Sequence, residues 1–208
     1  VCHHTAEIRD PVCVPIGAGP PDHVPAAILP SDTTRVADLA QVNPPDKISG
    51  WVRLWLLGLL ETRPGWDGVV CATYGQNTHW VEISADEIVS SRSALTRQLS
   101  QVMHGEEAID TEALAASISR PERLASDLYV AQLKNQGAAV TSHLLGAELA
   151  AMRAYWLGRD VVVIGDHEAT YATALKSQGA PVTVSDSEAL LRAGLAAFAR
   201  ATGREEMC

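Results

Sequence analysis

Residues 68–90, GVVCATYGQNTHWVEISADEIVS, decide the fold of this chain. An apolar run at residues 69–72 meets a Gly-Gln-Asn turn, and an alternating run follows at residues 78–84. After a second short turn the pattern continues with Ile88 and Val89. Runs of period two separated by turn residues are typical of antiparallel strands joined by hairpins. The stretch therefore predicts a meander of consecutive antiparallel strands.

Downstream of the meander, the pattern changes to helices and buried strands. Helical spacing or a capping residue predicts helices over residues 91–104, 111–119, 121–135, 138–157, 168–178 and from Ser185/Asp186 to 201. A continuous apolar run predicts a strand buried on both faces at residues 160–164, and another strand is predicted at residues 181–184. Strand, glycine turn, helix and strand in succession indicate parallel pairing. The predicted fold class is therefore α/β.

Residues 1–50 are rich in Pro, Gly and Asp and predict loops with one or two short strands. Ser49 is predicted to cap a helix over residues 50–62, whose apolar stripe favours core packing. Pro64-Gly65 ends this helix, so a boundary is predicted at residues 64–67. We divide the chain into residues 1–66 and residues 67–208.

Charge and composition exclude several classes of function. The 208 residues carry a formal net charge of −9 without a basic stripe, which argues against nucleic-acid binding. The most apolar helix candidate, residues 51–60, is too short to cross a bilayer, so no membrane partner is expected. No secretory signal or disulfide framework stands out, which favours a cytoplasmic location.

The four cysteines show no CxxC pair. Cys71 lies in a predicted strand and is interpreted as a small buried hydrophobic residue. Cys2, His3, His4 and Cys13 have a spacing that fits no standard zinc pattern, so no metal site is predicted there.

Several segments together resemble the 2-dehydro-3-deoxygalactonokinase family of the actin-like sugar kinases. Residues 74–81, YGQNTHWV, resemble that family's P-G-T-H-x-K-W-V turn, and residues 143–149, HLLGAEL, resemble its G-L-L-I-G-A-E helix. Further similar segments lie between residues 41 and 202 in the family's order. The resemblance implies a ribonuclease-H-like (actin-like ATPase) lobe with a mixed sheet and flanking helices over residues 67–208. Residues 1–66 would then be the remnant of an N-terminal lobe.

The sequence also departs from the family pattern. The D-x-G-[ST] hairpin that opens such kinases is not found in these residues. The family's M-R-G-E-E segment is ISGWV at residues 48–52, and its M-T-G-E-L segment is LTRQL at residues 95–99. In the turn, Gln76 and His79 replace the family's Thr and Lys. Phosphoryl transfer depends on such charged groups, which suggests impaired transfer.

The resemblance implies two groups of ligand-contacting residues. Phosphate is expected at Gly75, Gln76, Asn77 and Thr78, whose backbone N–H groups could cradle it, although a plain hairpin turn explains them equally well. Nucleotide is expected at Gly146, Glu148, Gly165, Asp166 and His167. Asp166 and His167 also suit a helix cap, and Glu148 also suits a structural ion pair. The sequence indicates no catalytic residue.

Two functions follow from the sequence. The first is ATP-dependent phosphorylation of a 2-keto-3-deoxy sugar acid, with ATP and Mg²⁺ as cofactors and a nucleotide or sugar acid as ligand. The second is a non-catalytic binding or assembly module derived from the same fold. For that role we expect the helix face with Trp51, Trp55 and Leu57 to be exposed and to contribute to a homodimer or a contact with another chain.

Overall fold

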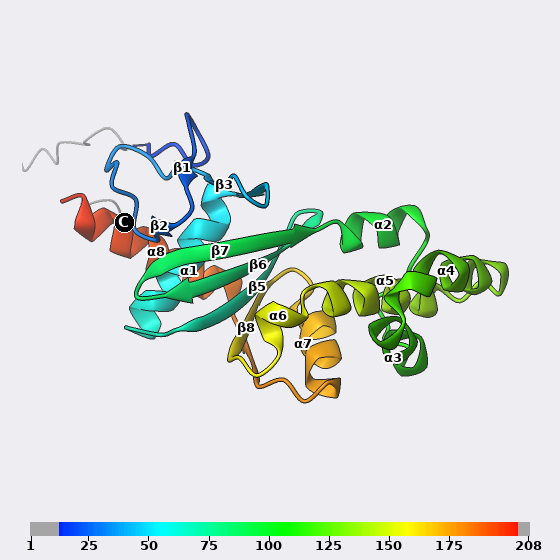
Figure 1. The fold of residues 1–208 in the computed structure, drawn as a ribbon. Coiled ribbons are helices and arrows are strands. Elements are labelled where there is room, and N and C mark those ends of the chain that lie inside the picture. Colours follow the sequence, from blue (N-terminus) through cyan, green and yellow to red (C-terminus); the bar gives the residue numbers. More distant parts are fainter. Residues whose placement is uncertain (1–12, 204–208) are drawn as a thin grey trace, which may run out of the picture.

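The computed structural model describes residues 13–203 and contains two sheets (Figure 1). The predicted meander is present and longer than the sequence pattern suggests. It consists of the antiparallel strands β5 (Gly68–Tyr74), β6 (Asn77–Ser84) and β7 (Glu87–Ala94). Residues 91–94, predicted as the start of a helix, continue β7, so that part of the prediction was wrong. Strand β7 is long because it pairs with β6 up to Ala94, opposite Thr78.

The meander forms the centre of a six-stranded mixed sheet in the order β2-β7-β6-β5-β8-β9. Strands β8 (Val161–Gly165) and β9 (Val182–Ser185) extend it in parallel from β5, as predicted. The two-residue strand β2 (Ala26–Ala27) pairs with β7 at the other edge. A meander on one side and parallel strands on the other confirm the α/β class and explain why β8 reads as fully apolar.

Helices cover both faces of the sheet. On one face α1 (Gly50–Thr62) packs with α8 (Ser187–Ala201), and the other carries α5 (Gly137–Ala151), α6 (Arg153–Trp156) and α7 (Glu168–Ser177) (Figure 1). Neighbouring strand residues face opposite layers: Val70 and Ala72 belong to the first core, and Val69 and Cys71 to the second. The period of two that predicted the strands thus separates two hydrophobic cores.

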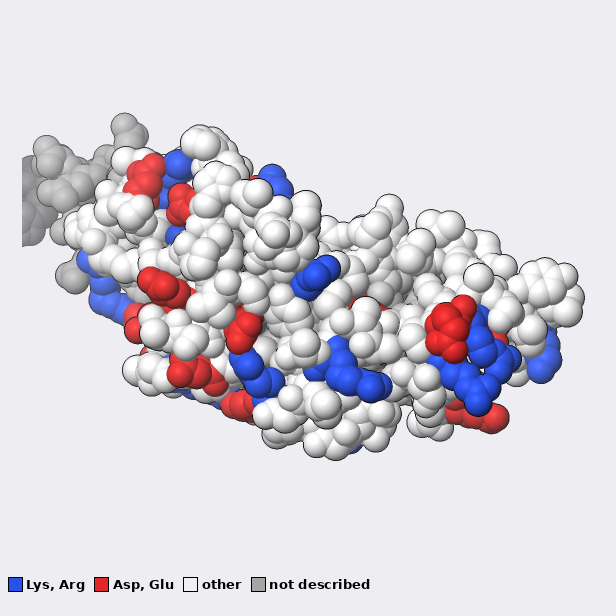
Figure 2. Space-filling view, viewed as in Figure 1, with Lys and Arg blue, Asp and Glu red and all other residues white. Residues whose placement is uncertain are grey.

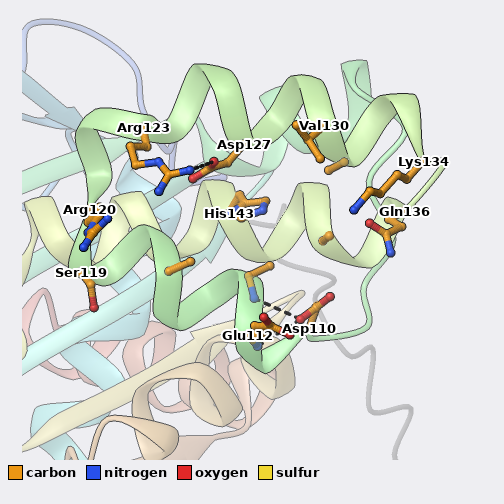
Figure 3. A pocket seen from close by; sticks show the side chains of 14 residues that line it. Asp110, Glu112, Ser119, Arg120, Arg123, Asp127, Val130, Lys134, Gln136 and His143 are labelled. Carbon is orange, nitrogen blue, oxygen red and sulfur yellow. Dashed lines mark hydrogen bonds and ion pairs between the residues drawn. The ribbon is translucent and has the colours of Figure 1, made fainter.

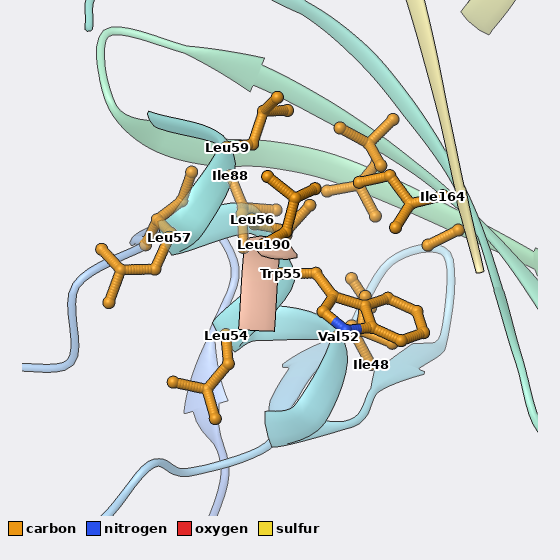
Figure 4. Close-up of a cluster of buried hydrophobic side chains, with 14 of the residues drawn as sticks. Ile48, Val52, Leu54, Trp55, Leu56, Leu57, Leu59, Ile88, Ile164 and Leu190 are labelled. Carbon is orange, nitrogen blue, oxygen red and sulfur yellow. The ribbon is translucent and has the colours of Figure 1, made fainter. Parts of the chain in front are cut away.

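Helix α1 bears on two of the predictions, its N-terminal cap and the exposure of its aromatic face, which belongs to the core drawn in Figure 4. Ser49 caps α1, because its side chain accepts a hydrogen bond from the N–H of Trp51. Trp55 and Leu57 are both buried in this core, so the prediction that they form an exposed face was wrong. Trp51 alone of that face remains 39% exposed.

The N-terminal part forms a small sheet of its own. Its strands are β1 (Asp22–His23), β3 (Leu39–Gln41) and β4 (Asp46–Ile48), in the order β1-β3-β4. The buried Arg53 of α1 ties this part to the helix, donating hydrogen bonds to the carbonyl oxygens of Ile28, Ala27 and Ala37 and pairing with Asp22. The division at residue 66 stays a prediction.

A group of helices lies beyond the end of the sheet. These are α2 (Thr96–Val102), α3 (Thr111–Ser119), a 3₁₀ turn (Pro121–Arg123) and α4 (Leu124–Leu133). The helix predicted over residues 138–157 is α5 followed by the short α6, with a break at Met152. Figure 2 shows acidic and basic side chains interspersed on the face drawn, with basic side chains gathered where α3 and α4 lie.

Cys71 is buried, as predicted, and the burial raises the pKa of its thiol. Cys2, His3 and His4 lie outside the described residues, and Cys13 is exposed. Within residues 13–203, no cluster of three or more His, Cys, Asp or Glu side chains is arranged to hold a metal. None of the described helices is long and apolar enough to span a bilayer.

Candidate functional site

The turn that follows β5 and the turn that follows β8 are far apart in the sequence, but they lie side by side where the two strands end. Strands β5 and β8 are parallel and pair Thr73 with Gly165, so both strands end at the same edge. The backbone N–H of His167 donates to Thr73 Oγ1 over 3.2 Å. Such an edge is where open α/β sheets usually bind ligands. The predicted phosphate turn and the predicted nucleotide turn are therefore neighbours.

Gly165 permits this close approach. Its φ of +116° is one that L side chains rarely adopt, and a Cβ atom at this position would lie 2.0 Å from the carbonyl oxygen of Thr73. Any side chain would therefore force the β8 turn away from β5. The glycine is required by the local geometry, whatever the ligand.

The turn between β5 and β6 presents its backbone to solvent. Gly75 has a φ of +60° and, like Gln76, is exposed, while Asn77 is half-buried. Thr78 is different, because it is buried and its hydroxyl lies 2.6 Å from the hydroxyl of Tyr171. Gly75, Gln76 and Asn77 can thus offer groups to a phosphate, whereas the Thr78 side chain is occupied by the interior.

Arg97, at the start of α2, joins the two turns. Its Nη1 donates a hydrogen bond to the carbonyl oxygen of Gly75 and lies 3.6 Å from Asp166 Oδ2. Asp166 therefore interacts with a cation of another helix. Although His167 occupies the N-cap position of α7, no side-chain hydrogen bond caps that helix. The helix-cap interpretation of Asp166 and His167 finds no support in these contacts.

A cavity of about 150 Å³ lies beside these turns, between α2, α5 and α7. Arg97, Thr141, Leu145, His167 and Tyr171 are among its lining residues. The His167 ring also lies in it, with Nδ1 3.0 Å from Glu107 Oε1. The cavity combines apolar surface with polar and charged side chains, as small-ligand sites do.

Glu148 lies behind this cavity and is almost fully buried. Trp80 Nε1 donates to its Oε1 over 2.7 Å, and the Tyr171 hydroxyl donates to its Oε2 over 2.9 Å. Burial raises the pKa of the Glu148 carboxyl, while hydrogen bonds from Thr96, Trp80 and Tyr171 oppose that rise. Within residues 13–203 no cation pairs with it, so the structural ion pair considered from the sequence is not formed.

Gly146 serves a helix contact in this structure. A Cβ atom there would lie 2.6 Å from the carbonyl oxygen of Leu114, so the glycine lets α5 approach α3. Glu148 borders the cavity through Tyr171 and Thr96, which line it and hydrogen-bond to the Glu148 carboxyl. A nucleotide contact of Gly146 and Glu148 stays a prediction, and the positions of both residues suit a supporting role.

Sequence reasoning missed Arg97, Glu107 and Tyr171. Arg97 carries a signal, because it stands where the family segment M-T-G-E-L has glycine. Glu107 and Tyr171 carry none, since only the folded chain brings them to the turns. Magnesium usually binds one or two carboxylates together with substrate phosphates. Asp166, which is 61% exposed, is the carboxylate at the turn that could take that part.

A second, larger cavity of about 530 Å³ lies between α3 and α4, with α5 as its floor (Figure 3). His143 points into it from α5, and Arg123 pairs with Asp127 on its wall. Its lining residues include none of the predicted phosphate or nucleotide residues, and its charges are mixed. The two turns and the smaller cavity therefore form the candidate site.

Comparisons with known proteins bear on the fold of the chain and on the family that it resembles. A model of the 2-keto-3-deoxy-galactonokinase family matches residues 111–198, which is less than half of the chain and a narrower range than the resemblance suggested. No curated protein matches the sequence.

Two solved structures are similar to the chain. The crystal structure of a candidate 2-dehydro-3-deoxygalactonokinase from Sinorhizobium meliloti shares 24% identity, with a TM-score of 0.74, and the match covers 87% of this chain and 73% of that one. Component A of (R)-2-hydroxyglutaryl-CoA dehydratase from Acidaminococcus fermentans shares 11% identity over 82% and 70% of the chains, and its TM-score of 0.43 supports no argument. The first match shows a shared fold and confirms the ribonuclease-H-like prediction. Together with the family model, it confirms the resemblance of this chain to the 2-dehydro-3-deoxygalactonokinase family.

Proposed function

We propose that this chain is a 2-dehydro-3-deoxygalactonokinase-like protein that binds an adenine nucleotide across the β5 and β8 turns. The observation that carries the proposal is the contact between these turns, where Gly165 lies against Thr73 and His167 donates to it. The adenosine part of the nucleotide binds beside His167, in the cavity of about 150 Å³, and the phosphates extend toward Gly75, where a Cβ atom would meet nothing within 4 Å.

Phosphoryl transfer by this chain is proposed to be strongly reduced. Transfer requires carboxylates that bind the metal or orient the attacking hydroxyl. At the positions where the resembled family has them, this chain has Trp51, Val52 and Gln98. Trp51 and Gln98 lie exposed on α1 and α2. Binding of nucleotide survives because it uses different residues.

Calorimetric titration with adenosine, together with an ADP-release assay, tests both halves of the proposal. We expect adenosine to bind with a Kd of roughly 0.1–1 mM. With ATP, Mg²⁺ and 2-dehydro-3-deoxygalactonate, we expect no ADP release above background. Steady turnover would refute reduced transfer, and an absence of adenosine binding would refute the nucleotide site.

A pair of glycine variants shows whether adenosine binds at the β8 turn. Gly165→Ala places a Cβ atom against Thr73 and pushes the β8 turn away from it. Gly179→Ala is the control, because Gly179 also has a positive φ (+77°) but a Cβ atom there would meet nothing within 4 Å. We expect only Gly165→Ala to abolish adenosine binding. A thermal melt shows whether both variants fold. If Gly165→Ala does not fold, His167→Ala serves as the second test. Equal affinity in wild type, Gly165→Ala and His167→Ala would place adenosine elsewhere.

The second candidate function is assembly without catalysis. The observation that favours it is an exposed apolar stripe on α2, made of Leu95, Leu99 and Val102 at helical spacing. Such a stripe suits contact with a second copy of the chain. We expect a dimer in sedimentation at micromolar concentration that Leu99→Asp converts to a monomer. A monomeric wild type would contradict this role.

A further inference from the structure

Arg97 is the cationic side chain that reaches the carbonyl group of the predicted phosphate turn. The resembled turn P-G-T-H-x-K-W-V carries a lysine, and in this chain the corresponding residue is His79. His79 is buried, and burial lowers its pKa, so it does not supply a positive charge to the turn at neutral pH. Arg97 comes from α2 and has its Nη1 on the carbonyl oxygen of Gly75. A cation is thus present from another part of the chain.

The guanidinium of Arg97 is only partly satisfied. Its Nε is buried and has no hydrogen-bond partner among residues 13–203. Its ionic partner, Asp166, lies 3.6 Å away and is 61% exposed, so the pair is weak. A guanidinium has five N–H donors in a planar fork that matches phosphate oxygens. Arg97, which lines the cavity, therefore has N–H donors that residues 13–203 do not take up.

Backbone groups around Arg97 favour an anion at the same place. The exposed turn at Gly75 and Gln76 presents backbone to solvent beside the guanidinium. Helix α7 begins at Glu168 without a side-chain cap, so no side chain takes up its first N–H groups, and its dipole is favourable to negative charge. The negative charges of Asp166 and Glu168 repel an anion there, and Asp166 already forms an ion pair with Arg97.

We propose that Arg97 anchors the phosphate groups of the bound nucleotide and that Asp166 is its counter-ion when no nucleotide is bound. A di- or triphosphate replaces the Asp166 carboxylate on the guanidinium and takes up further N–H groups of the turn. This inference rests on the proposed nucleotide site and specifies the part of the ligand that Arg97 binds. It predicts that a nucleotide with phosphates binds more tightly than adenosine. A site with an intact turn but no cation would not show this gain.

Calorimetric titrations with adenosine, ADP and inorganic pyrophosphate test the proposal on four proteins: wild type, Arg97→Met, Asp166→Asn and the control Arg159→Met. Methionine keeps an apolar stem and removes the charge. Arg159 pairs with Glu82 away from the turns, so its variant controls for the loss of one positive charge. Thermal melts confirm that all four are folded.

We expect wild type to bind ADP roughly tenfold more tightly than adenosine, as for a charge-assisted contact. Arg97→Met should abolish pyrophosphate binding and bring the ratio of ADP affinity to adenosine affinity to about one, whatever the affinity for adenosine itself becomes. Asp166→Asn should raise ADP affinity several-fold, and Arg159→Met should match wild type. Equal ADP affinity in wild type and Arg97→Met would overturn the proposal, as would tighter ADP binding by Arg97→Met.

The outcomes separate this inference from the proposed function. Pyrophosphate binding that depends on Arg97, without adenosine binding, would keep the anchor and reject the nucleotide site. Adenosine binding without any gain from phosphates would keep the nucleotide site and reject the anchor. Absence of binding by all three ligands would reject both.

Discussion

Replacing Glu148 with leucine should destabilise the protein because it removes the acceptor of a buried donor. Trp80 is fully buried, and its indole N–H has Glu148 Oε1 as its partner at 2.7 Å. Without that oxygen the N–H stays unsatisfied, which costs about 1–3 kcal/mol. The Tyr171 hydroxyl retains Thr78 at 2.6 Å, so its loss is smaller. We expect Glu148→Leu to lower the free energy of unfolding by about 2 kcal/mol in urea denaturation, or about 4–8 °C in Tm.

Glu148→Gln is the matched control. Its carbonyl oxygen can accept from Trp80, and its amide can donate to the Tyr171 hydroxyl, which then donates to Thr78. We therefore expect glutamine to cost less than about 1 kcal/mol. Equal destabilisation by leucine and glutamine, or none by leucine, would refute the assignment of Glu148 as the acceptor for Trp80.

The same pair predicts a pH dependence of stability. Burial raises the pKa of Glu148 above its ordinary value of 4.5, so the folded state binds this proton more tightly than the unfolded state. The contribution of Glu148 is fully present below pH 4.5 and falls as the pH rises from there through the folded-state pKa. We expect the stability of wild type relative to Glu148→Gln to fall over that interval, and a rise would contradict the direction of the shift.

Two further variants test the contacts that position the site. Arg53→Met removes the guanidinium that donates to three carbonyl oxygens and to Asp22. We expect the free energy of unfolding in urea denaturation to fall by about 3 kcal/mol. A change below about 0.5 kcal/mol would contradict that role. Thr73→Val keeps the shape of the buried side chain but removes the acceptor for the His167 N–H. We expect about 1 kcal/mol lower stability and weaker adenosine binding by calorimetry, and unchanged adenosine affinity would show that this contact does not position the β8 turn.

Local patterns predicted the elements wherever burial follows the periodicity of the chain. Strands β5 and β8 are continuously apolar because both of their faces contact a hydrophobic core, whereas β6 and β7 include polar residues such as Glu82 and Arg92 that remain partly or fully exposed. Asp186 at the start of α8 and Ser49 at the start of α1 cap as expected, since a cap depends on neighbours in the chain. The pattern failed at residues 91–94, where pairing with β6 decided the structure over local propensity.

The candidate site could be predicted only in part. The glycine turns at Gly75 and Gly165 are visible in the sequence because a positive φ has few alternatives to glycine. The sequence does not show that Thr78 and Glu148 are buried together, because their shared partner Tyr171 comes from α7.

The sequence by itself therefore determined the α/β class, the meander and the glycine turns, since these depend on residues that are near one another in the chain. Only the tertiary structure decided that Arg97, Asp166 and Gly75 meet, and that Trp55 and Leu57 are buried. The physical reason is that charge pairing and burial act between segments that the chain brings together from long sequence separations. The parallel register of β5 and β8 fixes these meetings at one edge of the sheet.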